Sequence, residues 1–338
     1  METHPTNYGE LKGITSATHY KSGGLKSCMV NQKNCLQTPF GDIVPQYRSA
    51  EFGERQKKHR SSLDFFEDGQ IKSAALDSQA ELGTPIGPIK AELVTFYPEG
   101  SINRIFPLNG LIDGYWSENN EREIAELMDF DLPIGQFRAK VISIHFYPSG
   151  ALKTLTIWPG QVIQLQTPLG QIACRAGFSL YEDGSLRSAE PASIVEIPTP
   201  IGLIKAYDPE IIGMHADQNS LQFSKTGTLS ALTTIHSGIC IKDSSGEETR
   251  VEPYEADSYV DPTQLRTVPM KIEFSPENVR IEAREFYEYE LSACQFASFA
   301  HQRVSRAVCN GCPNDDTCCQ NGGEGVGESG GCCGGCGG

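Results

Sequence analysis

Cysteines are concentrated at the C-terminal end of the chain, in a spacing typical of metal ligands. Residues 309–338 contain seven of the 12 cysteines, no lysine or arginine, and many glycines. Two of the cysteine groups have the pattern Cys-x-x-Cys, in which the intervening residues let the chain turn both thiolates toward one tetrahedral ion. We therefore predict that this tail binds a thiophilic metal through ligands drawn from Cys309, Cys312, Cys318, Cys319, Cys332, Cys333 and Cys336.

The identity of the metal and the use of the thiols stay open at this point. Soft thiolates bind zinc, copper(I) and iron–sulfur clusters alike. The tail could instead carry out thiol redox chemistry, attach the protein to a surface, or have no specific role. An anionic, glycine-rich segment cannot bury enough apolar surface to order itself, so any order in it should come from bound metal. Four other cysteines are expected to be inert packing residues: Cys28, Cys174, Cys240 and Cys294.

Two short motifs recur in the part of the chain that precedes the tail. The first places proline, an apolar residue and glycine in a row, directly after Thr38, Thr84, Leu132, Thr167 and Thr199. The second is a turn of the type Phe-Tyr-Pro-Ser-Gly, and its copies end at Gly69, Gly100, Gly150, Gly184 and Gly227. Glycine supplies the positive φ that tight hairpin turns require. We interpret both motifs as bends of an antiparallel meander, with the proline bends at the end opposite to the glycine turns.

The residues between these bends have the pattern of strands. Ile172–Leu180 is apolar at every second position, which indicates a strand with one buried face and one solvated face. Larger intervals between bends indicate inserted loops. In the insertion that follows Ile105, Ser117 is a candidate N-cap for a short helix, with Ile124, Leu127 and Met128 on one face.

The sequence therefore predicts a mostly β protein built on an antiparallel hairpin-repeat sheet, either open or wound like a solenoid, with one short inserted helix. We divide it into an irregular N-terminal segment (1–35), a β-hairpin repeat region (36–235), a closing β segment (236–290), a C-terminal helix (291–308) and the cysteine- and glycine-rich tail (309–338). The helix is predicted because Cys294, Phe296, Phe299 and Val304 recur at helical spacing.

Two of the glycine turns carry a family resemblance. Phe146–Lys153 and Tyr181–Ser188 resemble the hairpin repeats of MORN proteins and of the related antitoxin-like repeat family, and the Thr-Pro-Ile-Gly bends resemble those of an uncharacterised group of bacterial repeat proteins. The resemblance covers roughly residues 36 to 235, and the intervals between motifs are less regular than in MORN arrays. It implies a scaffold or binding surface, sometimes facing lipid, and assigns no catalytic residue.

Composition and charge restrict the partners. The 28 basic and 43 acidic residues give a net charge of −15, which repels phosphate backbones and anionic lipid, so we expect no nucleic acid partner. No stretch has the roughly 20 apolar residues that a transmembrane helix needs, and residues 1–49 lack the layout of a signal peptide. A cytoplasmic location with reduced thiols is the expectation.

Candidate catalytic groups are few. His215 and Asp217 form a neighbouring pair without a third group at a readable spacing, and the basic run Arg55–Arg60 reads as a solvated loop. We therefore predict a non-enzymatic scaffold or binding protein with a protein partner and with sheet edges that could join copies of the chain. Metal storage or delivery by the tail, and thiol redox chemistry, are the alternatives.

Overall fold

The computed structural model describes residues 3–51, 53–58, 61–209, 219–258 and 264–302. Most of the strand residues among them lie in one open antiparallel sheet, which we call the large sheet. Its strands pair in the order β3 (Ile14–His19), β4 (Leu25–Val30), β7 (Leu63–Phe65), β8 (Ile71–Thr84), β9 (Gly87–Phe96), β10 (Ile102–Phe106), β12 (Gly135–Phe146), β13 (Leu152–Ile157), β15 (Gly170–Leu180), β16 (Leu186–Pro191), β19 (Leu221–Phe223), β20 (Leu229–Thr234), β25 (Met270–Phe274), β26 (Asn278–Glu282) and β27 (Phe286–Glu290).

Smaller units accompany the large sheet. The first halves of β12 and β15 pair with β11 (Leu127–Leu132) and β14 (Ile163–Thr167). Separate hairpins are β1 (Thr3–Thr6) with β2 (Gly9–Lys12), β5 (Leu36–Thr38) with β6 (Gly41–Ile43), β17 (Val195–Thr199) with β18 (Gly202–Ala206), and β23 (Tyr254–Asp257) with β24 (Leu265–Val268). A three-stranded sheet has the order β22 (Glu248–Val251), β21 (Ser237–Lys242) and β28 (Gln295–Ala300).

The predicted mostly antiparallel β class is thus confirmed. The proline bends and the glycine turns, however, lie beside each other on the same side of the molecule. A Cβ placed on Gly150, in a glycine turn, would lie 3.1 Å from Cγ of Pro85, in a proline bend. Gly184 and Pro133 approach each other in the same way. The prediction that proline bends and glycine turns lie at opposite ends of the strands is wrong. The long strands bend at β-bulges, such as the register shift between Ala75 and Ala80, so each strand that leaves a glycine turn comes back to the side where the glycine turns lie.

Each proline hairpin is thereby folded over the large sheet, and the core lies between the two layers. The strand register aligns one apolar residue from each strand between β4 and β26 of the sheet into a buried row. This row contains Cys28, Leu63, Ala74, Val94, Ile105, Ile144, Leu155, Phe178, Ala189, Leu221, Leu232, Ile272 and Ile281.

The neighbouring residue of each strand points to the opposite face and forms a second row, which we call the polar row. Successive strands contribute one side chain each, because alternate residues of a strand face opposite sides. Ala231 is the apolar member. The others are Thr18, Ser27, Asp64, Ser73, Thr95, Arg104, His145, Thr154, Ser179, Ser188, Gln222, Glu273, Arg280 and Glu288.

The glycine turns share one set of bonds. In each, the backbone N–H of the first residue bonds to the carbonyl four positions on, and the glycine N–H bonds back to the first residue; these turns start at Tyr20, Phe66, Tyr97, Tyr147, Tyr181 and Ser224. The tyrosine hydroxyls also bond to a neighbouring turn: Tyr147 Oη donates to the carbonyl of Leu180 at 3.0 Å, and Tyr20, Tyr97 and Tyr181 make the equivalent bond to Phe65, Phe146 and Phe223. The turn at Tyr20 has the same bonds, although its sequence does not match the motif closely.

Two predicted segments differ from the structure. Residues 1–35, expected to be irregular, contain β1 to β4; β3 is an exposed edge strand whose polar side chains hide the apolar alternation. The helix predicted at 291–308 is also wrong, because residues 295–300 form β28, which pairs with β21. The spacing of Phe296 and Phe299 suits a helix turn, but an available strand edge on β21 decides the conformation. Residues 303–308 lie outside the described part of the chain.

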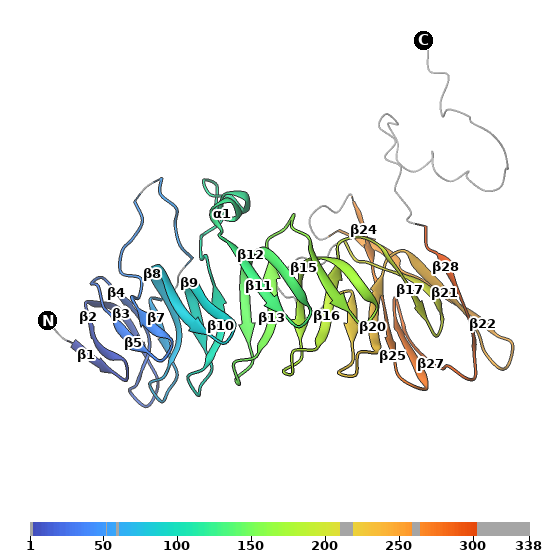
Figure 1. The fold of residues 1–338 in the computed structure, drawn as a ribbon, viewed down its shortest axis with the longest axis horizontal. Coiled ribbons are helices and arrows are strands. Elements are labelled where there is room, and N and C mark those ends of the chain that lie inside the picture. The colour runs from blue at the N-terminus through green and yellow to red at the C-terminus, as the bar shows by residue number, and fades with distance from the viewer. Residues whose placement is uncertain (1–2, 52, 59–60, 210–218, 259–263, 303–338) are drawn as a thin grey trace, which may run out of the picture.

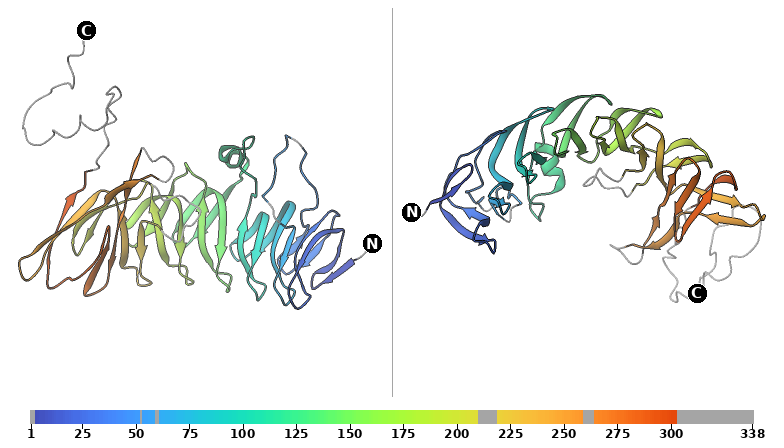
Figure 2. Two further views of the ribbon diagram at one scale, coloured as in Figure 1. Left: turned by 180° about the vertical axis from the view of Figure 1, so that it is seen from behind. Right: turned by 90° about the horizontal axis from the view of Figure 1, so that it is seen from below.

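The short inserted helix is confirmed. It is α1 (Glu118–Ile124), capped by Ser117, whose hydroxyl accepts the backbone N–H of Asn120 at 3.2 Å. Leu127 and Met128, expected on the helix, instead begin β11. Figure 1 shows the sheet running the length of the molecule, and Figure 2 shows that it curves into an arch with α1 on the inner side. None of the described helical structure has the length and apolar character needed to cross a bilayer.

Candidate functional site

The sequence-predicted site residues do not lie in the part of the chain that the structure describes. Cys309, Cys312, Cys318, Cys319, Cys332, Cys333 and Cys336 belong to residues 303–338, and His215 and Asp217 belong to residues 210–218. Within the described ranges, no group of three or more histidine, cysteine or acidic side chains is arranged to hold a metal ion. The metal prediction for the tail therefore stays a prediction.

A cavity lies on the face of the large sheet that carries the polar row. Two inserted segments, described at residues 45–51, 53–58 and 61–62 and at residues 107–126, meet over this face around a volume of about 520 Å³. The lining is mainly apolar, and its apolar side chains are Ala75, Leu93, Phe106, Leu108, Ile112, Ile142, Trp158 and Pro159. Because α1 forms part of the wall, the cavity opens on the inner side of the arch.

The polar row supplies a carboxylate at the base of the cavity. Asp64 accepts hydrogen bonds from the hydroxyls of Ser61, at 2.7 Å, and Ser73, at 2.5 Å. Both serines line the cavity with Asp64, and Ser73 is its neighbour in the polar row. None of the described cations lies within salt-bridge distance of Asp64, so the two hydroxyls are the groups that hold the carboxylate in place.

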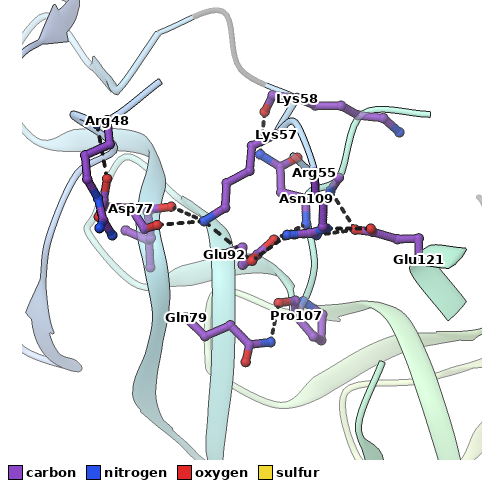
Figure 3. Close-up of polar contacts among 12 residues, drawn as sticks. Arg48, Arg55, Lys57, Lys58, Asp77, Gln79, Glu92, Pro107, Asn109 and Glu121 are labelled. Carbon is purple, nitrogen blue, oxygen red and sulfur yellow. Dashed lines mark hydrogen bonds and ion pairs between the residues drawn. The ribbon is translucent and has the colours of Figure 1, made fainter. Parts of the chain in front are cut away.

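A buried ion network joins the two insertions beside the cavity (Figure 3). Arg55 donates two hydrogen bonds to Glu92, at 2.9 and 2.8 Å, and its Nε donates to Glu121 at 2.7 Å. Asn109 and Gly110 add backbone N–H bonds to Glu92 and Glu121, each at 2.7 Å. Arg55 comes from the first insertion and Glu121 from α1, so this network fixes the helix over the sheet.

The charges of the network are stabilised by mutual contact. Burial by itself would raise the pKa of Glu121, but the hydrogen bonds from Arg55 and Trp116 outweigh it and hold the pKa below its usual value. For Arg55, burial opposes the charge, and the bonds to Glu121 and Glu92 raise the pKa above the ordinary value. The wall of the cavity is therefore held by ionised groups at neutral pH.

Both tryptophans of the chain lie at this site. Trp158 lines the cavity and is 7% exposed, and its indole Nε1 is a buried donor without a hydrogen-bond partner among the described residues. Trp116 donates its indole N–H to Glu121 at 2.7 Å. The sequence contains only these two tryptophans. Their fluorescence is therefore a direct report on the cavity.

A second buried polar cluster lies further along the same face. Glu190 is fully buried, accepts the backbone N–H and the hydroxyl of Ser220 at 2.7 and 3.0 Å, and lies 3.6 Å from a guanidinium nitrogen of Arg175. Burial raises the pKa of Glu190 to about 7; the bonds from Ser220 and the charge of Arg175 oppose this, and Asp208 adds to it. This carboxyl titrates near neutrality.

The buried cysteines have no features of reactive thiols. Cys28 and Cys174 lie in the core, where burial, followed by the nearby charges of Asp64 and Glu190, raises their pKa values to about 11 and about 12. Thiols of this kind are protonated at neutral pH and act as small apolar side chains.

The sequence did not predict the residues of the cavity. The prediction that the basic run Arg55–Arg60 is a solvated loop is wrong for two of its described side chains. Arg55 and Lys57 were expected in a solvated loop, but their side chains are only 17% and 14% exposed. Glu92 and Glu121 are 37 and 66 residues away from Arg55, so no local pattern could pair them.

Comparisons with known proteins add no assignment, since no protein family model, no curated protein and no solved structure matches the chain.

Proposed function

We propose that this chain is a non-enzymatic repeat scaffold, similar in role to MORN-like proteins, that holds a protein partner on the inner face of its arch in the cytoplasm. The observation that carries the proposal is the cavity of about 520 Å³ over the polar row. An apolar pocket with a few converging polar groups is the usual form of a site for a small ligand, and such pockets also receive single anchoring side chains of partner proteins.

The arrangement of the insertions supports this role. The large sheet continues on both sides of the cavity, while the described residues of the two insertions rise from it and are joined to each other by the network of Arg55, Glu92 and Glu121. A rigid sheet that carries variable loops on one face can present a binding surface without disturbing its core. The charged groups of this network are engaged with one another, which fits a structural role for them.

The proposal is tested by retention of partners on the immobilised full-length chain. Cell extract is passed over the native protein and over two variants that narrow the cavity, Ala75→Phe at its base and Ile112→Trp at its exposed rim. Leu169→Phe, at an exposed proline bend, is the matched control. We expect a protein that the native chain and the control retain and that both cavity variants lose, as measured by quantitative mass spectrometry.

An identical set of retained proteins on all four chains would contradict the proposal. Ile112 is 42% exposed, so its replacement leaves the core intact even where Ala75→Phe impairs folding. The alternative functions, metal storage or delivery and thiol redox chemistry, place the activity in the tail. They would be favoured if the cavity variants changed nothing and the tail cysteines proved necessary.

A further inference from the structure

We propose that the cavity accepts a basic side chain, lysine or arginine, of the protein partner. This inference rests on the function proposed above and specifies the chemistry of the group that enters the site. The argument starts from the charges around the cavity. Among the described lining residues, the charged side chains are Lys58, Asp64, Glu118 and Glu121.

The described residues give the lining an acidic balance. Glu121 is neutralised by Arg55, whereas neither Asp64 nor Glu118 has a salt-bridge partner among the described residues. Lys58 is the one described cation of the lining, and its side chain points away from the ion network in Figure 3. The carboxylates of Asp64 and Glu118 outnumber the ammonium group of Lys58, and this balance favours a cationic ligand.

The shape and chemistry of the walls match a long basic side chain rather than a free inorganic cation. Lysine and arginine have aliphatic stems that pack on apolar surface while their charged ends reach a polar group. Here the stem would contact Leu93, Phe106 and Ile142, and the charged end would meet Asp64. Ser61 and Ser73 already orient that carboxylate, so little rearrangement is needed on binding.

The whole chain favours the same class of partner. A net charge of −15 attracts a basic surface over a distance and raises the rate of encounter. Trp158 also lines the cavity, and tryptophan is the aromatic residue that attracts cations most strongly.

The test uses tryptophan fluorescence of the full-length chain, since both tryptophans lie at the site. Three short peptides of alanine and glycine are compared, with lysine, acetyl-lysine or glutamate at the centre. Acetyl-lysine keeps the length of the stem and removes the charge. We expect the lysine peptide to bind at least tenfold more tightly than either other peptide, which corresponds to about 1.4 kcal/mol.

The variants assign this preference to the carboxylates. Asp64→Asn should reduce the preference for lysine over acetyl-lysine to within about twofold. Glu118→Gln, at an exposed position in the first turn of α1, should reduce it by a smaller factor. Asp42→Asn, an exposed acid on β6, removes the same charge far from the cavity and should leave the preference unchanged.

Three results would overturn the inference. Equal or tighter binding of acetyl-lysine or glutamate would show that charge does not select the ligand, and loss of the preference in Asp42→Asn would assign it to net charge alone. Release of a stoichiometric small amine on denaturing the purified protein would show that the occupant is not a protein side chain. If these results occur while Ala75→Phe and Ile112→Trp still abolish partner retention, the scaffold function stands and only the basic side chain is excluded.

Discussion

At the scale of single residues, the energetics of the polar face depend on charges that are buried in pairs. Glu92 and Glu121 are 5% and 3% exposed, and Arg55 bridges them. The attraction within a buried ion pair is offset by the loss of hydration, so the pair itself adds little. Removal of one partner is costly, because the remaining charge stays buried without compensation.

We therefore predict that Arg55→Ala destabilises the protein by about 3 to 5 kcal/mol, the usual result of leaving a buried charge unpaired. The measurement is the urea unfolding midpoint at neutral pH. Arg138→Ala is the matched control, since Arg138 pairs with Asp129 at 2.7 Å with both side chains more than half exposed. Such a surface pair contributes about 0 to 1 kcal/mol. Equal effects of the two substitutions would contradict a stabilising role for the buried network.

Glu190 leads to a prediction about pH. Its pKa is about 7 in the folded protein against an ordinary value of 4.5, so the folded state binds more protons between these two values. Stability from this group is complete below pH 4.5 and is lost as the pH rises through 7. The loss is on the order of 3 kcal/mol, because each unit of pKa corresponds to about 1.4 kcal/mol.

Glu190→Gln cannot ionise and should abolish this part of the pH dependence. Urea unfolding of the native and variant chains from pH 4.5 to 8 measures the difference between them. Glu196→Gln, whose side chain is 55% exposed, is the control and should keep the native slope. An unchanged slope in Glu190→Gln would mean that the carboxyl is ionised throughout this range.

At the scale of elements, the glycine turns are joined to one another by side chains as well as by the sheet. The turn tyrosines donate to the carbonyl that precedes the next turn, and a basic residue six positions later often covers the ring, as Lys153 does for Tyr147 at 5.5 Å. The second turn has Phe66 in place of tyrosine and lacks this bond. Lys72 lies over its ring at 5.8 Å, so the packing is otherwise preserved.

This difference predicts the effects of two substitutions. Phe66→Tyr should stabilise the protein by about 0.5 to 1 kcal/mol, because its hydroxyl can reach the carbonyl of Phe96, the position that accepts such a bond in the other turns. Tyr147→Phe should destabilise it by about 0.5 to 1.5 kcal/mol. Tyr115→Phe, at a side chain that is 83% exposed, is the control for thermal unfolding. A destabilising Phe66→Tyr would show that the second turn differs in geometry from the others.

At the scale of the whole molecule, the large sheet is open. Within the described ranges, β3 and β27 each pair on one side only, and we propose that these edges are where copies of the chain could join. The strands predicted to close the sheet extend it instead, from β25 to β27. The cavity opens on the inner face of the arch, where we propose that a partner binds.

The tail prediction is independent of the cavity. We propose that protein purified without oxygen holds zinc, copper or iron, and that the metal content falls in a Cys309→Ser/Cys312→Ser variant, because these residues form the first Cys-x-x-Cys pair. Binding should weaken as the pH falls, since thiolates must lose protons to coordinate. Elemental analysis measures this. Metal below about a tenth of an equivalent and unchanged in the variant would leave the tail without a metal site, because structural thiolate sites are normally full.

The sequence by itself determined the features that depend on neighbouring residues. Alternation in Ile172–Leu180 predicted that Cys174 and Phe178 enter the core, and both are fully buried. Ser179, expected on the solvated face, is also buried, because the opposite face of the strand is covered at that point. The bends predicted at Thr84 and Thr167 form hairpins, and Ser117 caps the predicted helix. These properties follow from local sterics and from the period of a strand, so they can be read without the rest of the chain.

Only the tertiary structure decided which distant groups meet. β28 is a strand because β21 offers it an edge, and the bulge in β8 brings the proline bends beside the glycine turns. The cavity combines Asp64, Ile112 and Trp158, which come from three separate segments. Such contacts depend on strand register and on the bends of long strands, and a shift of one residue would turn every side chain to the other face. The polar row is therefore a property of the assembled sheet.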